Sequence, residues 1–84
     1  MYEARLSRRA NRELISLENS VRRRIVLKLQ ELQDDPFPPG AAKLQGRLGI
    51  YRVRVGDYRI LYQVFRDEKL VLVEKIDHRS TVYE

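Results

Sequence analysis

The sequence has no cysteine and only one histidine among its 84 residues. Without cysteine there is no disulfide, no catalytic thiolate and no cysteine-ligated metal, and one histidine does not complete a zinc site. No apolar run approaches the roughly 20 residues that a membrane span needs, and residues 1–5 lack the apolar stretch of a secretory signal. We therefore expect a cytoplasmic protein that is not inserted in a membrane and that needs no metal or cofactor.

Motifs of two large enzyme classes are also missing. No glycine-rich loop stands between a strand and a helix to cradle a nucleotide phosphate. Ser7 and Ser20 stand where helix caps are expected, and neither has a recognisable histidine–acid partner for nucleophilic catalysis. The sequence therefore does not indicate a nucleotide-binding enzyme or a serine-nucleophile hydrolase.

Positive charge is what the sequence has in excess. Seventeen Lys and Arg stand against twelve Asp and Glu, which gives a net charge of +5 and a pI near 9.9. A basic domain of this size is expected to meet a polyanion, either nucleic acid or an acidic protein, although some small basic proteins bind no anionic partner. With 43% hydrophobic and 35% charged residues, the chain suits one soluble globular domain over residues 1–84.

Two helices are predicted in the first half of the chain. Apolar side chains recur at helical spacing over residues 8–18 and again over residues 20–33; the stripes are Ala10, Leu14 and Leu17, then Val21, Ile25, Leu29 and Leu32. Ser7 is the expected N-cap of the first helix. Pro36 ends the second, because proline cannot continue a helix and restricts the residue before it. The short connection predicts an antiparallel helical hairpin.

The apolar spacing changes from 3.6 to 2 after a proline-rich loop at residues 36–41. Alternation predicts strands over residues 51–55, 58–64 and 70–76, joined by a tight turn at Gly56-Asp57 and a turn at residues 66–69. Two further short strands are expected, over residues 2–6 and 43–45. The order β-α-α-β(3-4) indicates an α+β domain in which an antiparallel sheet packs against an N-terminal helical hairpin.

Three arginines are predicted to share one patch of this sheet. If Gly56-Asp57 is a two-residue loop, Arg54 lies directly opposite Arg59, and Arg52 lies about 6.6 Å from Arg54 on the same face. Like charges in this arrangement are destabilising, so their grouping favours a phosphate bound between them by planar guanidinium groups. We expect no acid to be interleaved on that face. The alternative is that the arginines form the solvated face of a half-buried strand.

A second group of chemically capable residues follows the last predicted strand. His78, Arg79 and Tyr83 lie within six residues of one another. The ordinary histidine pKa, about 6.5, suits proton transfer near neutrality, and a tyrosine can stack on a base or position a phosphate. The alternatives are a structural histidine and a tyrosine that packs over the sheet edge.

Taken together, these segments resemble the RelE/ParE superfamily of toxins, over essentially the whole chain. The matching pieces, of which the long middle one is quite specific, are Asp34-Asp35-Pro36, Lys43-Leu44-Gln45-Gly46, YRVRVGDYRILY at residues 51–62, His78-Arg79 and Val82-Tyr83. The basic strand and the C-terminal pattern look like the RelE branch rather than the gyrase-directed ParE branch. The resemblance implies a RelE-like fold and a ribosome-dependent endoribonuclease, the toxin of a type II toxin–antitoxin system. Such an enzyme cuts messenger RNA in the A site without metal, through attack of the ribose 2′-hydroxyl on the adjacent phosphorus.

The resemblance also implies roles for individual residues. Arg52 and Arg54 match the two basic strand positions of the family, and Arg59 matches its phosphate-binding arginine. Arg79 matches the arginine that acts as an acid or clamps the transition state, and Tyr83 matches the tyrosine that stacks on the substrate base.

The general base is the point at which the sequence departs from the family. The first basic strand position can be lysine in relatives, and lysine can serve as a base when its pKa is lowered. Arg52 effectively does not lose its proton and should stabilise charge instead. His78 is then the only conventional candidate for the base.

The resemblance further implies a cognate antitoxin whose acidic, partly disordered segment binds the toxin in a hetero-oligomer, with the ribosome and messenger RNA as the other partners. Two other functions stay open: ParE-like inhibition of gyrase, and a non-catalytic RNA- or protein-binding module of the same fold. The basic runs at residues 8–12 and 22–28 are either ordinary solvated helix faces or a salt-dependent footprint on ribosomal RNA.

Overall fold

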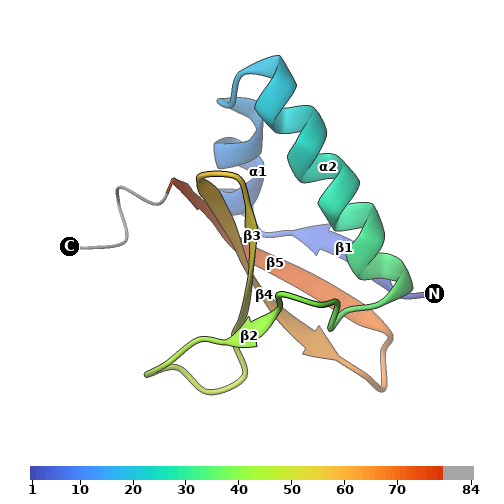
Figure 1. The fold of residues 1–84 in the computed structure, drawn as a ribbon. Helices are drawn as coiled ribbons and strands as arrows, with labels where there is room; N and C mark the ends of the chain where they lie inside the picture. Colours follow the sequence, from blue (N-terminus) through green and yellow to red (C-terminus); the bar gives the residue numbers. More distant parts are fainter. Residues whose placement is uncertain (79–84) are drawn as a thin grey trace.

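The computed structural model describes residues 1–78, in which two helices pack on one face of a five-stranded sheet (Figure 1). The elements in chain order are β1 (Glu3–Leu6), α1 (Arg8–Ile15), α2 (Asn19–Asp34), β2 (Ala42–Lys43), β3 (Tyr51–Val55), β4 (Tyr58–Phe65) and β5 (Leu70–His78). The α+β class and the predicted order of elements are confirmed. Within residues 1–78, no helix is long and apolar enough to cross a membrane.

The sheet has the strand order β1-β5-β4-β3-β2. Strands β2 to β5 form the predicted antiparallel meander, but β1 runs parallel to β5, so the sheet is mixed rather than antiparallel throughout. Alternation in a short strand indicates which of its faces is buried, not its neighbour or direction. The free edge that the meander leaves at β5 is where β1 pairs.

Side chains and proline define the helix ends. Ser7 caps α1 as predicted, because its hydroxyl oxygen accepts a hydrogen bond from the Ala10 backbone N–H at 3.0 Å. Helix α1 ends three residues earlier than its apolar spacing predicts. The Arg22 guanidinium donates to the carbonyl oxygen of its last residue, Ile15, at 3.0 Å. Helix α2 begins at Asn19 without the side-chain cap that was expected, and it ends at Asp34, one residue later than predicted and two residues before Pro36.

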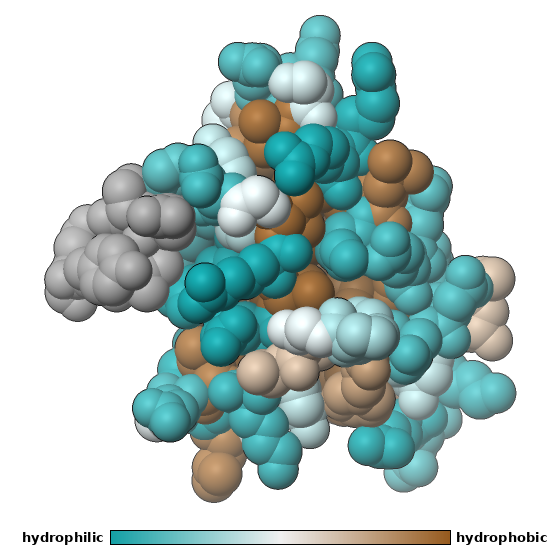
Figure 2. Space-filling model, viewed as in Figure 1, coloured by the Kyte–Doolittle hydropathy of each residue, from teal (hydrophilic) through white to brown (hydrophobic). Residues whose placement is uncertain are grey.

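One apolar cluster lies between the helices and the sheet. Its buried members are Ala10, Ile25, Leu29, Leu32, Val53, Val55, Ile60, Tyr62, Val71, Val73 and Ile76. Tyr62 is fully buried, and its hydroxyl donates to the Pro36 carbonyl oxygen at 2.7 Å. This bond ties the proline-rich loop to β4, and burial raises the pKa of Tyr62 to about 12. Hydrophilic side chains cover most of the side of the molecule seen in Figure 2.

Candidate active site

The three arginines predicted to act together lie on the sheet face that points away from the helices. Val53 and Ile60 belong to the core on the helix side, so the alternating neighbours on β3 and β4 face the other way. Arg54 is directly opposite Arg59, and Arg52 is opposite Leu61. The predicted hairpin register is therefore confirmed.

A tight turn holds this register. Gly56 has φ +59°, a conformation that side chains other than glycine rarely adopt. A β-carbon at Gly56 would also lie 3.0 Å from a guanidinium nitrogen of Arg24, which reaches the turn from α2. The turn therefore brings a fourth guanidinium close to the end of the β3–β4 hairpin.

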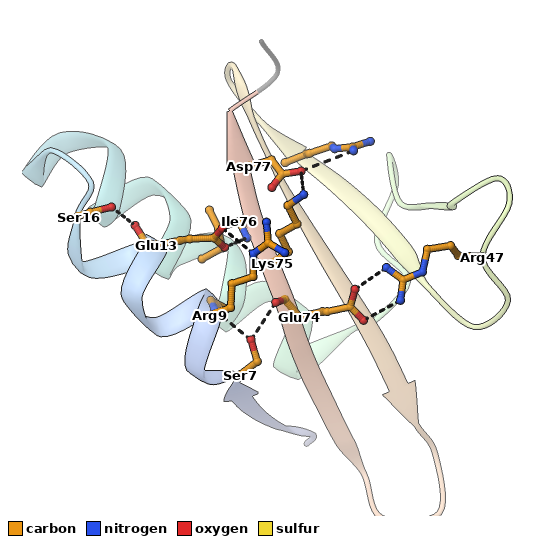
Figure 3. A network of polar contacts seen from close by, with 11 residues as sticks. Ser7, Arg9, Glu13, Ser16, Arg47, Glu74, Lys75, Ile76 and Asp77 are labelled. Atoms are coloured by element: carbon orange, nitrogen blue, oxygen red, sulfur yellow. Dashed lines mark hydrogen bonds and ion pairs between the residues drawn. The ribbon is translucent and has the colours of Figure 1, made fainter. Parts of the chain in front are cut away.

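An acid does lie among these cations, so the expectation of a face without one is wrong. β5 continues to His78, two residues past its predicted end, and Asp77 is opposite Arg59. One oxygen of Asp77, Oδ2, lies 3.6 Å from Arg59 Nη2 and 3.2 Å from Lys75 Nζ (Figure 3). The Asp77 residue is 4% exposed, and the two cations are partly exposed above it.

Asp77 and Lys75 reach this face because β5 contains an irregularity. Its pairing with β4 shifts register between Leu61 and Tyr62: Leu61 is opposite Lys75, whereas Tyr62 is opposite Val73. Glu74 is the extra residue, as in a β-bulge. The extra residue exchanges the two faces of β5 beyond it. Lys75 and Asp77, which a regular strand would point toward the helices, therefore point away from them.

The loop at residues 44–50 covers another part of the same face. Leu61 and Ile50 are buried outside the cluster that packs on the helices. Arg47 in this loop forms a two-pronged ion pair with Glu74 of β5, at 2.7 and 3.3 Å (Figure 3). Because β3 and β4 lie between β2 and β5 in the sheet, this contact holds the loop across the sheet face.

The loop and the neighbouring ends of β2 and β3 border an open hollow of about 390 Å³. None of the three predicted arginines lines this hollow; its lining residues are Lys43, Leu44, Gly46, Arg47, Leu48, Gly49 and Tyr51. The arginines instead lie on the sheet surface, where Arg54 is exposed and Arg52 and Arg59 are partly exposed. Such a surface suits an extended chain better than a small enclosed ligand.

His78 is not brought together with the arginines. It is opposite Tyr58, and the two rings meet edge-on with their centroids 4.9 Å apart. Tyr58 packs against the core on the helix side, so His78 faces away from Arg59. Arg79 and Tyr83, the other two predicted site residues, lie outside the described residues.

The groups at this site that can act on a ligand are the positively charged side chains of the sheet face. Over residues 1–78, no three His, Cys, Asp or Glu side chains group as metal ligands. Guanidinium groups donate to phosphate oxygens and keep their charge at all accessible pH values. The fold and the site thus define a small basic α+β protein with an open cationic sheet face.

Comparison with known proteins places this class more narrowly. A family model described as "ParE toxin of type II toxin-antitoxin system, parDE" matches residues 4–83. The chain therefore belongs to this family of type II toxin–antitoxin toxins, within the RelE/ParE superfamily that its sequence resembles.

Individual relatives carry RelE-type names. Toxin RelG of Mycobacterium tuberculosis is 26% identical over 98% of this chain and 95% of its own length. The isolated RelE toxin of Escherichia coli has a TM-score of 0.82 at 30% identity, over 99% of this chain and 92% of that one. A chain of the toxin–antitoxin complex RelBE2 of M. tuberculosis has a TM-score of 0.83 at 28% identity, over 93% and 98%.

Proposed function

We propose that this toxin is a metal-independent endoribonuclease that cleaves messenger RNA in the ribosomal A site and thereby stops translation in the cytoplasm. In this proposal residues 1–84 act as one RelE-like domain. The cationic face of β3, β4 and β5 binds the RNA backbone at the bond that is cut.

The observation that carries the proposal is the arginine pair Arg54 and Arg59, directly opposite each other across two strands. Like charges directly opposite each other across two strands are destabilising, and Asp77, 3.6 Å from Arg59, offsets only part of this cost in the free protein. An anion between the two guanidiniums removes that repulsion. A phosphodiester fits, because each guanidinium can donate to two oxygens of one phosphate.

The reaction proposed for this surface is an internal transfer at phosphorus. The ribose 2′-oxygen attacks the adjacent phosphorus, the bond to the 5′-oxygen of the next nucleotide breaks, and a cyclic phosphate is left. Negative charge increases on the phosphorus oxygens in the transition state, and fixed cations stabilise it there without rearranging. Arg52, Arg54 and Arg59 are proposed for this role.

Two further residues are proposed for proton transfer and for binding the base, and neither is among the three arginines of the sheet face. Arg79 as acid or clamp and Tyr83 as the stacking residue are proposed from the resemblance to the family. His78 is the one conventional base in the sequence, but it faces the helix side of the sheet together with Tyr58. We therefore propose that charge stabilisation supplies the larger part of the rate.

A cognate antitoxin is the proposed protein partner. Solved RelE-type relatives include complexes with RelB from M. tuberculosis, Escherichia coli and two archaea. A chain with a net charge of +5 should attract an acidic, partly disordered segment that orders on binding. Co-expression with the product of the adjacent gene tests this, and failure to co-purify at low salt would contradict it.

A second function, inhibition of gyrase, is favoured by one observation: the matching family model carries the ParE description. Cell-free translation separates the two. Truncated messages in the presence of ribosomes support the ribonuclease, whereas intact messages together with gyrase–DNA cleavage complexes support the ParE-like function.

The decisive variant is Arg59→Ala, with Arg23→Ala as its charge-matched control. Arg23 is exposed on α2, on the other side of the sheet. We expect Arg59→Ala to slow cleavage by about 10²–10³-fold, the usual loss for one transition-state donor, and Arg23→Ala to stay near wild type. Two variants that cleave at equal rates would contradict the proposed site. An Arg59→Ala variant that no longer cleaves but stays as toxic as the wild type would favour a protein that acts by binding alone.

A further inference from the structure

Asp77 is a negative charge in a place where RNA binding would disfavour one. Its side chain is 2% exposed and lies beside the cations of the sheet face. Burial of a carboxylate is costly unless the group is paired, and a negative charge near a phosphate site weakens phosphate binding. A role in binding RNA directly does not account for it.

The contacts of Asp77 indicate what it does instead. Its Oδ2 atom draws two cations from neighbouring strands, Arg59 and Lys75, to within 4 Å of a single point. Arg59 has four side-chain torsions, and without a partner it would sample many positions. A buried, immobile carboxylate restricts it to a small region above the sheet.

The contact leaves Arg59 able to bind a ligand. Its Nη2 lies 3.6 Å from Asp77, which is longer than a hydrogen bond, and its buried Nε has no hydrogen-bond partner among the described residues. A guanidinium has five N–H donors. Arg59 is therefore held by charge, while the donors of its terminal Nη nitrogens, and not the buried Nε, remain for phosphate oxygens.

Helix α1 supports this arrangement from the opposite side of the sheet. Where the irregularity interrupts β5, Glu13 accepts a hydrogen bond from the Ile76 backbone N–H at 2.8 Å (Figure 3). Ser7 donates to the Glu74 carbonyl oxygen, also at 2.8 Å. These two bonds satisfy backbone groups at the bulge, and the bulge is what turns Asp77 toward Arg59.

We propose that Asp77 is a positioning residue that fixes the Arg59 guanidinium for the phosphodiester. This rests on the proposed function of Arg59 as a phosphate ligand. Asp77 touches neither the RNA nor the reacting atoms; it acts through Arg59, and its own charge opposes RNA binding.

The sign of the effect of Asp77→Asn tests the proposal. The substitution keeps the shape of the side chain and raises the net charge by one, which alone would strengthen RNA binding. We expect kcat for A-site cleavage to fall by up to about 100-fold, the cost of misplacing a group by about 1 Å, with KM unchanged or lower. Glu68→Gln, on the exposed β4–β5 turn, adds the same charge and should keep the wild-type kcat.

A double substitution separates positioning from other effects. In an Arg59→Ala background, Asp77→Asn should cost no further activity, because the residue through which it acts is gone. An Asp77→Asn variant that cleaves at the wild-type rate or faster would overturn the proposal, and so would full additivity of the two losses.

A measurement of side-chain motion does not depend on activity. Nitrogen-15 relaxation of the Arg59 Nε–H group should show it ordered on the ps–ns timescale in the wild type and more mobile in Asp77→Asn, while Glu68→Gln leaves it unchanged. Equal order in the wild type and in a folded Asp77→Asn variant would refute positioning by Asp77. If the Asp77→Asn substitution releases Arg59 and the wild type cleaves no message, the positioning stands and the proposed ribonuclease function fails.

Discussion

Replacement of Tyr62 by phenylalanine removes one oxygen from the centre of the protein and leaves the ring in place. The hydroxyl is fully buried and donates at 2.7 Å to the Pro36 carbonyl oxygen. Without it, a buried carbonyl loses its partner, which costs about 1–3 kcal/mol. Because a domain of this length has a free energy of unfolding of roughly 4–13 kcal/mol, the loss is large. The melting temperature should fall by about 4–8 °C for each kcal/mol.

Burial of the same hydroxyl makes the stability of the wild type depend on pH in the alkaline range. Burial disfavours the phenolate and raises the pKa of Tyr62 from 10.0 to about 12. Since the pKa in the folded state is higher than in the unfolded state, the stabilisation is complete below pH 10. It is lost as the pH rises from about 10 to about 12. Two pKa units correspond to on the order of 2–3 kcal/mol, and the phenylalanine variant cannot lose this contribution.

Urea unfolding followed by circular dichroism at pH 7, 10 and 11.5 measures both effects. The gap in unfolding free energy between the wild type and Tyr62→Phe should be 1–3 kcal/mol at pH 7, by about the cost given above, and should narrow at the highest pH. Tyr2→Phe is the control, because Tyr2 is only partly buried, and it should change stability by less than about 0.5 kcal/mol. A gap that is absent at pH 7, or that stays constant with pH, would refute the reasoning.

Three shorter predictions concern the site. His78→Gln should leave the single-turnover rate and the pH–rate profile unchanged; loss of a limb near the ordinary histidine pKa would show that His78 is the base after all. Gly56→Ala should lower the unfolding free energy by about 1 kcal/mol or more, measured by urea titration, because of its positive φ and the nearby Arg24 guanidinium. Arg54→Ala should reduce the slope of log affinity for ribosome-bound message against log salt concentration by about 0.7, the value for one phosphate contact on a single strand; an unchanged slope argues against that contact.

The parts of the fold that the sequence predicts are those that local patterns encode. The apolar spacing of α2, the serine cap of α1 and the Gly56-Asp57 turn are each determined by residues within a few positions of one another. The length of this turn determines which residues of β3 and β4 lie opposite each other. The sequence alone therefore predicts the pairing of Arg54 with Arg59. A two-residue loop leaves only one register for the strands it joins.

Features that depend on distant parts of the chain could not be predicted in this way. The parallel pairing of β1 with β5 joins residues almost 70 positions apart. No pattern of residues within β1 indicates which strand it pairs with. The same holds for the loop at residues 44–50, because its position over the sheet depends on Arg47 meeting Glu74 of β5. Long-range pairs of this kind leave no periodic signal in either segment.

Asp77 shows how a single extra residue in a strand hides part of a site. Alternation assigns a strand to its two faces only as far as the first bulge, because one added residue exchanges the faces beyond it. Continued from Val71 and Val73, regular alternation buries residues 75 and 77 on the helix side and points residue 76 outward. The one sign of the exchange is that the next buried apolar residue is Ile76. A carboxylate that appears to belong to the core by counting therefore lies beside Arg59, where its charge changes how the cationic face must be understood.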